Sequence, residues 1–145
     1  MKVRDAMTAD VALASPDDTL REAAQAMLRY DFGALPVGEG DRLVGMLTDR
    51  DIAVRAIAMG LGPDTKVRDV MSPEVKYCYA DDDLGAVAAN MGELQVRRLP
   101  VVDADKRLVG IVSMGDVANF ERAQVTGRAV ASVSMPGGEH SQAGP

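Results

Sequence analysis

A ten-residue stretch in the first half of the chain, residues 42–51, reads RLVGMLTDRD, and residues 107–116 repeat it as RLVGIVSMGD. The similarity extends beyond these two stretches. Residues 3–53 align with residues 67–118 when the second copy carries one extra residue, Lys106, and 20 of the 51 paired positions are then identical. Two similar units fused in one chain usually pack about a pseudo-twofold axis. The sequence therefore predicts that the clefts between the two units come in related pairs.

The spacing of apolar residues predicts the same order of elements in each copy: strand, helix, strand, strand, helix. In the first copy, Thr19 opens a capping box of the form Thr-x-x-Glu, and apolar residues follow it at helical spacing. The expected elements of this copy are strand 11–14, a helix after Thr19, strands 34–37 and 42–47, and helix 49–59. Those of the second copy are strand 75–79, a helix with apolar residues from Leu84 to Met91, strands 99–102 and 108–112, and helix 114–122. A single helical turn, residues 3–7 or 67–71, is expected before each first strand.

These elements predict an α/β (α+β) fold of two tandem β-α-β-β-α repeats. The first repeat is expected to span residues 1–62 and the second residues 63–123. Helical periodicity fades from about Gln124, and Ser, Gly, Pro and Ala dominate the end of the chain. Residues 124–145 are therefore expected to form a flexible tail or a segment that orders only with a partner.

Composition excludes several classes of protein. The net charge of −6 argues against nucleic-acid binding, which needs clustered Lys and Arg. No apolar run approaches the roughly 18–20 residues that cross a bilayer, and the first residues lack a secretion signal, so a soluble cytoplasmic protein is expected. The only cysteine, Cys78, cannot form an internal disulfide, and the only histidine, His140, lies in the expected tail. A Cys/His metal site within one chain is excluded, and Cys78 is expected to pack in the core.

The most specific chemical pattern is Gly, two apolar residues, Thr or Ser, any two residues, then Asp. It ends the third strand of each repeat, with Thr48 and Asp51 in the first and Ser113 and Asp116 in the second. One interpretation is a helix N-cap followed by an acid in the first turn. The other interpretation is functional, and repetition at equivalent places favours it. A helix start and a hydroxyl suit a phosphate, a carboxylate one turn later can accept ribose hydroxyls, and glycine lets a planar base approach the strand.

With these motifs, the Leu-Pro-Val strands and the opening Val-Arg-Asp-x-Met, the chain resembles a tandem pair of CBS domains, first named in cystathionine β-synthase, over about residues 3–122. It resembles in particular stand-alone actinobacterial CBS pairs such as mycobacterial hypoxic-response proteins. The resemblance implies a non-catalytic regulatory module for energy sensing, without a required cofactor or metal. Its clefts between the repeats would bind AMP, ADP, ATP or S-adenosylmethionine, and it would signal to an unknown partner as a disk-like homodimer. The alternative is a dimeric interaction protein whose clefts are vestigial and bind no ligand.

The resemblance also assigns site residues. Asp51 and Asp116 would take the ribose hydroxyls, with Thr48 and Ser113 beside the ribose or phosphate. Each cleft would borrow the start of the other repeat's first strand to hold the base. The borrowed residues would be Thr8, Val11 and Ala12 facing Asp116, and Ser72, Val75 and Lys76 facing Asp51.

Charge makes the two predicted clefts unequal. Basic residues before the Leu-Pro strand would meet phosphates, and Arg97 and Arg98 hold that place in the second repeat, whereas the first has Gly33 and Ala34. The first motif contains Arg50, but also Asp49, which would repel a phosphate. We therefore expect the cleft with Asp116 to be the better phosphate site.

Overall fold

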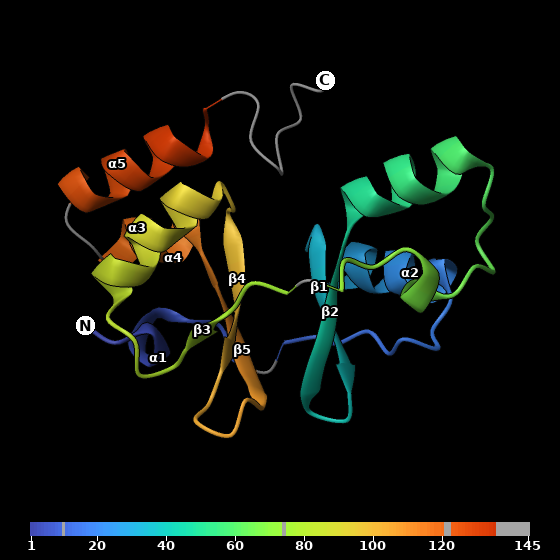
Figure 1. Ribbon diagram of the computed structural model, residues 1–145, viewed down its shortest axis with the longest axis horizontal. Coiled ribbons are helices and arrows are strands. Elements are labelled where there is room, and N and C mark those ends of the chain that lie inside the picture. Colours follow the sequence, from blue (N-terminus) through green and yellow to red (C-terminus); the bar gives the residue numbers. More distant parts are fainter. Residues whose placement is uncertain (10, 74, 121–122, 136–145) are drawn as a thin grey trace. The chain divides into compact units, whose positions relative to one another are not determined.

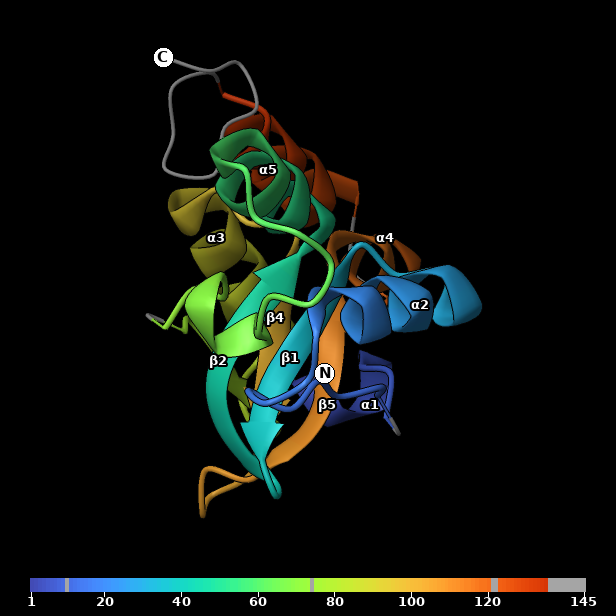
Figure 2. The same cartoon turned by 90° about the vertical axis from the view of Figure 1, so that its right-hand side faces the viewer.

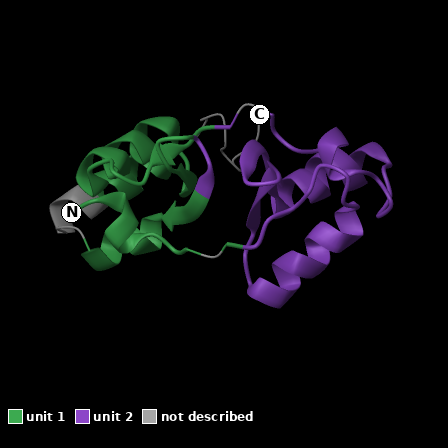
Figure 3. Cartoon of the chain, turned by 90° about the horizontal axis from the view of Figure 1, so that it is seen from below, with its two compact units in different colours: residues 1–11, 76–105, 109–145 green, residues 12–75, 106–108 purple. Residues whose placement is uncertain are grey.

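The computed structural model describes residues 1–135 except residues 10, 74 and 121–122 (Figure 1). The chain forms two compact units, and neither is a continuous segment (Figure 3). Unit 1 contains Met1–Val11, Lys76–Asp105 and the chain from Val109 onward, and unit 2 contains Ala12–Val75 and Lys106–Leu108. Both units contain helices and strands, and no helix in the described ranges is long and apolar enough to cross a membrane.

Unit 2 holds a two-stranded antiparallel sheet with a helix beside it (Figure 2). Strands β1 (Ala34–Glu39) and β2 (Arg42–Thr48) pair with a bulge at Val37 and Gly38. Helix α2 (Leu20–Tyr30) begins at the predicted capping box, where the Thr19 hydroxyl accepts the Glu22 N–H at 3.2 Å. The remaining elements are the π-helix η1 (Asp51–Ala56) and the 3₁₀ turns η2 (Ile57–Met59) and η3 (Val67–Asp69).

Unit 1 holds a three-stranded sheet in the order β3 (Cys78–Tyr79), β4 (Arg98–Val102), β5 (Leu108–Ser113). Strand β3 runs parallel to β4, with Cys78 opposite Val101. The helices are the single turn α1 (Val3–Ala6), α3 (Leu84–Leu94), α4 (Met114–Phe120) and α5 (Ala123–Val133).

The opening turns of the two repeats are exchanged between the units. The turn at Val3 lies in unit 1, where the Val3 N–H donates to the Asp82 carbonyl at 2.9 Å. The equivalent turn at Val67 lies in unit 2 and donates to the Asp18 carbonyl at 2.8 Å. Both valines are fully buried, each in the core of the repeat that did not supply it. Equivalent ion pairs, Arg4 with Asp81 and Arg68 with Asp17, lie beside these turns. Each core is therefore completed by the other repeat.

The expected first strand of repeat 1 is wrong. Only Ala14 pairs, as an isolated parallel bridge to Val37, through bonds to the Pro36 carbonyl (3.0 Å) and from the Gly38 N–H (2.9 Å). The next ladder bond would need an N–H from Pro16, which proline lacks. Repeat 2 has Ala80 at the equivalent place, and its N–H donates to the Val102 carbonyl at 2.9 Å. Strand β3 exists for this reason, although it is shorter than the predicted 75–79.

The expected flexible tail is also wrong for its first part, because Ala123–Val133 forms helix α5. This helix packs against α3, and its Ala129 joins the core of unit 1. Packing on α3 stabilises this helix, because burial of an apolar face contributes more to helix stability than local propensity does. The rest of the expected tail, residues 136–145, lies outside the described residues. The expected helix 49–59 is present as η1 and η2, and Gly60 ends it in the left-handed region with φ 82°.

The exchange predicts that a core substitution in one repeat's opening turn loosens the other repeat. Val3→Ala removes two buried methyl groups and should lower the free energy of unfolding by about 2 kcal/mol, measured by urea denaturation. Hydrogen exchange read by mass spectrometry should then speed up mainly in residues 84–112. Val67→Ala is the matched variant and should speed up exchange mainly in residues 20–48. Faster exchange confined to the mutated repeat's own sequence would contradict the exchanged arrangement.

Candidate functional site

The paired motif forms a reciprocal cap at the start of α4. The Asp116 Oδ2 atom accepts the Ser113 N–H at 2.8 Å, and the Asp116 N–H donates to the Ser113 Oγ atom at 3.1 Å. The capping interpretation is therefore correct for this motif. Among the described residues, no hydrogen bond or ion pair uses the second carboxylate oxygen, Oδ1. The carboxylate of Asp116 is half-buried, so it keeps one oxygen available to accept hydrogen bonds from a ligand.

The first repeat builds the same cap but engages the second oxygen. The Asp51 Oδ2 atom accepts the Thr48 N–H at 2.9 Å, and the Asp51 N–H donates to the Thr48 Oγ1 atom at 3.0 Å. The Asp51 Oδ1 atom lies 3.9 Å from Nη1 of Arg55, one turn later. Phe120 holds the equivalent place in the second repeat. The Asp51 carboxylate therefore has an arginine one turn later, whereas the Asp116 carboxylate has a phenylalanine at that position.

The two motif glycines, Gly45 and Gly110, are closely approached by other segments of the chain, which indicates a packing role for them. A Cβ atom on Gly110 would lie 2.7 Å from the Thr8 carbonyl oxygen and 2.8 Å from the Met7 sulfur. Thr8 and Ile111 exchange two backbone hydrogen bonds of 2.9 Å, which hold the exchanged segment on β5. The exchanged segment therefore fills the place that a side chain at Gly110 would occupy, and this contact accounts for the glycine without a ligand; the approach of a base to this strand stays a prediction.

Unit 2 repeats this contact. A Cβ atom on Gly45 would lie 2.5 Å from the Met71 sulfur, and Ser72 pairs with Met46 on β2. Both methionines occur at the same place in the opening motif, as Met7 and Met71, and sequence reasoning missed their role. Their repetition beside a repeated glycine was the signal that could have revealed it.

The charges beside the two helix starts have opposite signs. In unit 1 the Arg97 carbonyl accepts the Met114 N–H at 2.9 Å, so the exposed Arg97 and Arg98 begin next to the cap of α4. In unit 2 the Gly33 carbonyl accepts the Asp49 N–H at 2.9 Å, and a Cβ atom on Gly33 would lie 3.0 Å from Oδ2 of Asp49. The charge of Arg97 and Arg98 would attract an anion at the unit 1 site, whereas at the unit 2 site Asp49 would repel one and the nearby Arg50 and Arg55 would attract it.

The structure brings together some of the predicted site residues within single units. Thr8, Arg97, Arg98, Ser113 and Asp116 gather around the end of β5 in unit 1. In unit 2, Ser72, Thr48 and Asp51 gather around the end of β2, and Arg50 is exposed beside them. Ala12 and Lys76 fall in the other unit from the carboxylates that they were predicted to face, Asp116 and Asp51, whereas Val11 and Val75 share a unit with them. The base contacts assigned to these four residues stay predictions.

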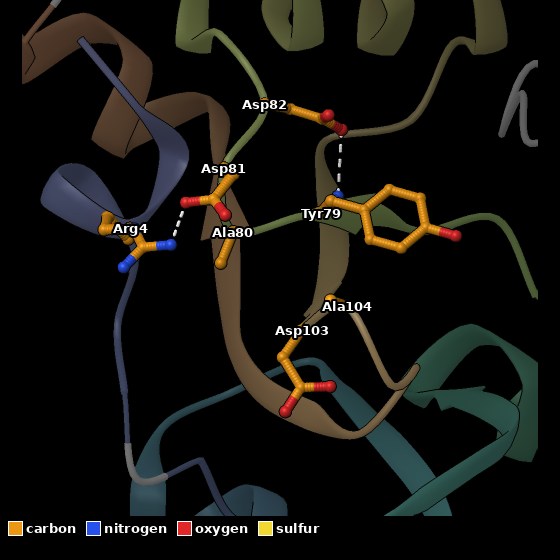
Figure 4. Close-up of a pocket in the computed structure, with 7 residues that line it drawn as sticks. All are labelled: Arg4, Tyr79, Ala80, Asp81, Asp82, Asp103 and Ala104. Carbon is orange, nitrogen blue, oxygen red and sulfur yellow. Dashed lines mark hydrogen bonds and ion pairs between the residues drawn. The ribbon is translucent and has the colours of Figure 1, made fainter.

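A pocket in unit 1 lies away from these residues (Figure 4). It has a volume of about 400 Å³ and is lined by Arg4, Tyr79, Ala80, Asp81, Asp82, Asp103 and Ala104. Figure 4 shows Arg4 directed at Asp81, and the Asp82 carboxylate accepts the Tyr79 N–H at 2.9 Å. Three carboxylates and one guanidinium make the lining acidic, which disfavours a phosphate. The pocket shares no residue with the predicted ligand site.

Cys78 packs in the core, as expected. Its side chain is buried, with the sulfur 3.8 Å from the Pro100 carbonyl oxygen. Burial, with a smaller contribution from the charge of Asp82, raises the pKa of the Cys78 thiol to about 12. The thiol therefore stays protonated near neutral pH and is a poor nucleophile and metal ligand.

Comparison with known proteins identifies the repeats. A family model described as "CBS domain" matches residues 3–57 and again residues 67–122. The CBS domain-containing protein YhcV of Bacillus subtilis is 44% identical over 133 residues, which are 91% of this chain and 94% of YhcV. Hypoxic response protein 1 of Mycobacterium tuberculosis is 44% identical over 117 residues, 79% of this chain and 81% of that protein.

Solved structures agree with this match. The crystal structure of Hypoxic Response Protein I with two coordinated zinc ions has a TM-score of 0.76 and 41% identity, covering 84% of this chain and 100% of that one. CBSX2 in complex with AMP has a TM-score of 0.72 and 29% identity, covering 81% and 93%. The CBS domain pair of MJ0100, in complex with 5′-methylthioadenosine and S-adenosyl-L-methionine, has a TM-score of 0.74 and 27% identity, covering 83% and 94%.

The zinc ions of the first of these structures have no fitting ligand set in the described part of this chain. Those residues contain no cluster of three or more His, Cys, Asp or Glu side chains placed to hold a metal. The buried, protonated Cys78 is a poor zinc ligand, and His140 lies outside the described residues. No role for zinc follows from the residues that the structure describes.

Gly110→Ala should destabilise the protein, because the new methyl group meets a backbone oxygen that cannot rotate away. We expect the free energy of unfolding to fall by about 1–3 kcal/mol in urea denaturation. Gly62→Ala is the control, since a Cβ atom there meets no atom within 4 Å. Equal stability of the two variants would show that the contact between Thr8 and Gly110 is not tight.

Cys78 should react with a thiol reagent such as DTNB only after unfolding. At pH 8 we expect slow modification of the native protein and rapid modification in denaturant. The raised pKa also sets the sign of a pH effect on stability. Its contribution is fully present below pH 9, the ordinary pKa, and is lost as pH rises toward 12, because the unfolded thiol ionises first. Immediate native-state labelling would contradict the buried thiol.

Proposed function

Because this chain belongs to the CBS domain family, we propose that it is a regulatory module that binds an adenosine-containing ligand beside the start of α4. The observation that carries the proposal is that the two carboxylate oxygens of Asp116 have different surroundings. One oxygen caps the helix by accepting the Ser113 N–H, and no described residue engages the other. The cap holds the carboxylate in place, so its second oxygen needs no reorganisation before accepting a ribose hydroxyl.

The ligands of the related structures support this choice. AMP in CBSX2, and 5′-methylthioadenosine and S-adenosyl-L-methionine in MJ0100, are all adenosines that differ at the 5′ position. The part they share is the adenine base and the ribose with its two hydroxyls. A preorganised carboxylate recognises those hydroxyls through hydrogen bonds to an ionised acceptor, which are stronger than neutral ones.

The charge of Arg97 and Arg98 should distinguish ligands with a phosphate at the 5′ position from those without one. Arg97 and Arg98 begin beside the cap, and guanidinium groups bind phosphates well. We therefore propose that AMP, ADP or ATP binds at this site in preference to S-adenosylmethionine, which carries no phosphate. The unit 2 site has the Asp49 carboxylate in place of these arginines and has Arg55 near Asp51, so we expect it to bind nucleotides more weakly.

The ligand would act by changing the populations of two arrangements of the chain. It can do so only if it binds one of them more tightly than the other. A partner protein would then recognise the favoured arrangement, and the module itself would catalyse no reaction.

Asp116→Asn should weaken AMP binding about tenfold or more in isothermal titration calorimetry. The amide oxygen can still accept the Ser113 N–H, but the charge that strengthens the ribose contact is lost. Asp51→Asn is the matched control and should have the smaller effect. Arg98→Ala should weaken ATP binding more than S-adenosylmethionine binding. No heat and no thermal shift with AMP, ATP and S-adenosylmethionine, or equal effects of the two asparagine variants, would refute the assignment.

A further inference from the structure

In unit 1, helix α5 packs against the two helices whose ends lie at the proposed ligand site. Figure 1 shows α5 lying along α3, and α5 also contacts α4. Helix α3 ends a few residues before Arg97 and Arg98, and α4 carries Asp116 in its first turn. The position of α5 can therefore affect both the groups proposed to bind phosphate and the carboxylate proposed to bind ribose.

Helix α5 buries few of its side chains on α3. Among the α5 side chains that the structure describes, those of residues 127–133, only Ala129 is buried. The helices approach closely at Gly92 of α3, where a Cβ atom would lie 3.0 Å from the Ser132 Cβ atom. Elements with few buried apolar contacts open more easily than the core of a domain. A small free-energy difference is therefore enough to shift α5 between a docked and a released state.

The side chain of Gln95 holds the end of α5 through hydrogen bonds. Its Nε2 atom donates to the carbonyl oxygens of Ser132, at 3.3 Å, and Met135, at 3.1 Å. Carbonyls at and just beyond the end of a helix lack partners within it, so a donor from outside satisfies them. Gln95 is also the residue that ends α3, in the left-handed region with φ 57°. One residue therefore ends α3 and fixes the end of α5.

The turn that begins at Gln95 leads directly to the two arginines. The Val96 N–H donates to the Met91 carbonyl at 3.0 Å, which joins the turn to α3. The Arg97 carbonyl accepts the Met114 N–H at 2.9 Å, which joins the turn to the start of α4. Because its backbone is bonded at both ends, a displacement of Gln95 also displaces the backbone of Arg97.

The first repeat has the same turn but lacks the features that admit α5. Asp31 ends α2 with φ 56°, and the residue after it closes the helix with the equivalent backbone hydrogen bond, 3.1 Å long. An ionised aspartate has no hydrogen to donate, so it could not bond helix carbonyls as Gln95 does. Leu28 holds the place of Gly92 and is 85% exposed. The turn is therefore common to both repeats, whereas the amide donor and the glycine belong to the second.

We propose that Gln95 couples the docking of α5 to nucleotide binding at the Asp116 site, so that each favours the other. Docked α5 fixes Gln95 and the backbone of Arg97, which reduces the freedom that is lost when a phosphate binds. By linkage, a nucleotide that binds the ordered turn more tightly stabilises the docked state by the same factor. This inference rests on the proposed function and specifies its regulation: the docked or released state of α5 is the signal that a partner would recognise.

Gln95→Met tests the coupling, because it removes the amide donor but keeps an unbranched, neutral side chain. Hydrogen exchange read by mass spectrometry should become faster in residues 123–135. Isothermal titration calorimetry should show AMP binding that is weaker by about fivefold or more. In the wild type, AMP should slow exchange in the same residues. Asp31→Asn, at the equivalent turn of unit 2, is the matched control and should change neither quantity.

Gly92→Leu undocks α5 by a different route, because it places the residue of the first repeat where α5 approaches α3. Leucine is a good helix former and the first repeat carries it at this place, so α3 should be retained. Exchange in residues 123–135 should become faster, and AMP binding should weaken as in Gln95→Met. The double variant should bind AMP no more weakly than the weaker single variant, because both changes act through the same undocking.

The two measurements separate this coupling from the proposed function. Faster exchange in residues 123–135 of Gln95→Met with unchanged AMP affinity would overturn the coupling and leave the nucleotide site intact. Weaker AMP binding without faster exchange would also overturn it, because the effect would then not pass through α5. Additive losses of affinity in the double variant would contradict a shared route. A wild type that binds no AMP would overturn the proposed function and the coupling together.

Discussion

The contact between each repeat's opening segment and the other repeat's motif glycine is the constraint on which the rest of the structure depends. The Thr8 carbonyl lies so close to β5 that no side chain fits on Gly110, and Met71 leaves equally little room at Gly45. Val3 and Val67, just before these contacts, complete the two cores. Because each core needs a segment from the other repeat, neither repeat has a complete core from its own sequence.

The same strands end in the Thr/Ser-x-x-Asp caps, so the core and the candidate site are coupled along β2 and β5. A cap and a ligand site use the same groups here without conflict. In Asp116 one oxygen stabilises the helix start, and the other is not engaged by any described residue. In Asp51 the second oxygen lies near Arg55, which weakens the case for a ligand there. One substitution in the helix, between Arg55 and Phe120, thus accompanies the divergence of the two sites.

Duplication followed by divergence explains why the two repeats differ around the same motif. The second repeat carries the arginines beside its cap and covers its α3 face with α5. The first repeat carries an acid beside its cap and leaves its α2 face open around Leu28. We propose that nucleotide binding belongs to the second repeat. The acidic pocket around Asp81 takes no part in the proposed nucleotide binding, because its charge disfavours a phosphate.

The sequence by itself determined the duplication, the order of the elements apart from the first strand of repeat 1 and helix α5, the caps at Thr19, Thr48 and Ser113, and the burial of Cys78. These features depend on hydrogen bonds within a few residues or on apolar spacing, which local sequence reports directly. Only the tertiary structure decided the exchange of the opening turns, the reason for Gly45 and Gly110, and the docking of α5 on Gly92. Each of these is a contact between residues far apart in the chain. Local periodicity contains no information about which distant backbone will approach a glycine, so geometry alone could reveal them.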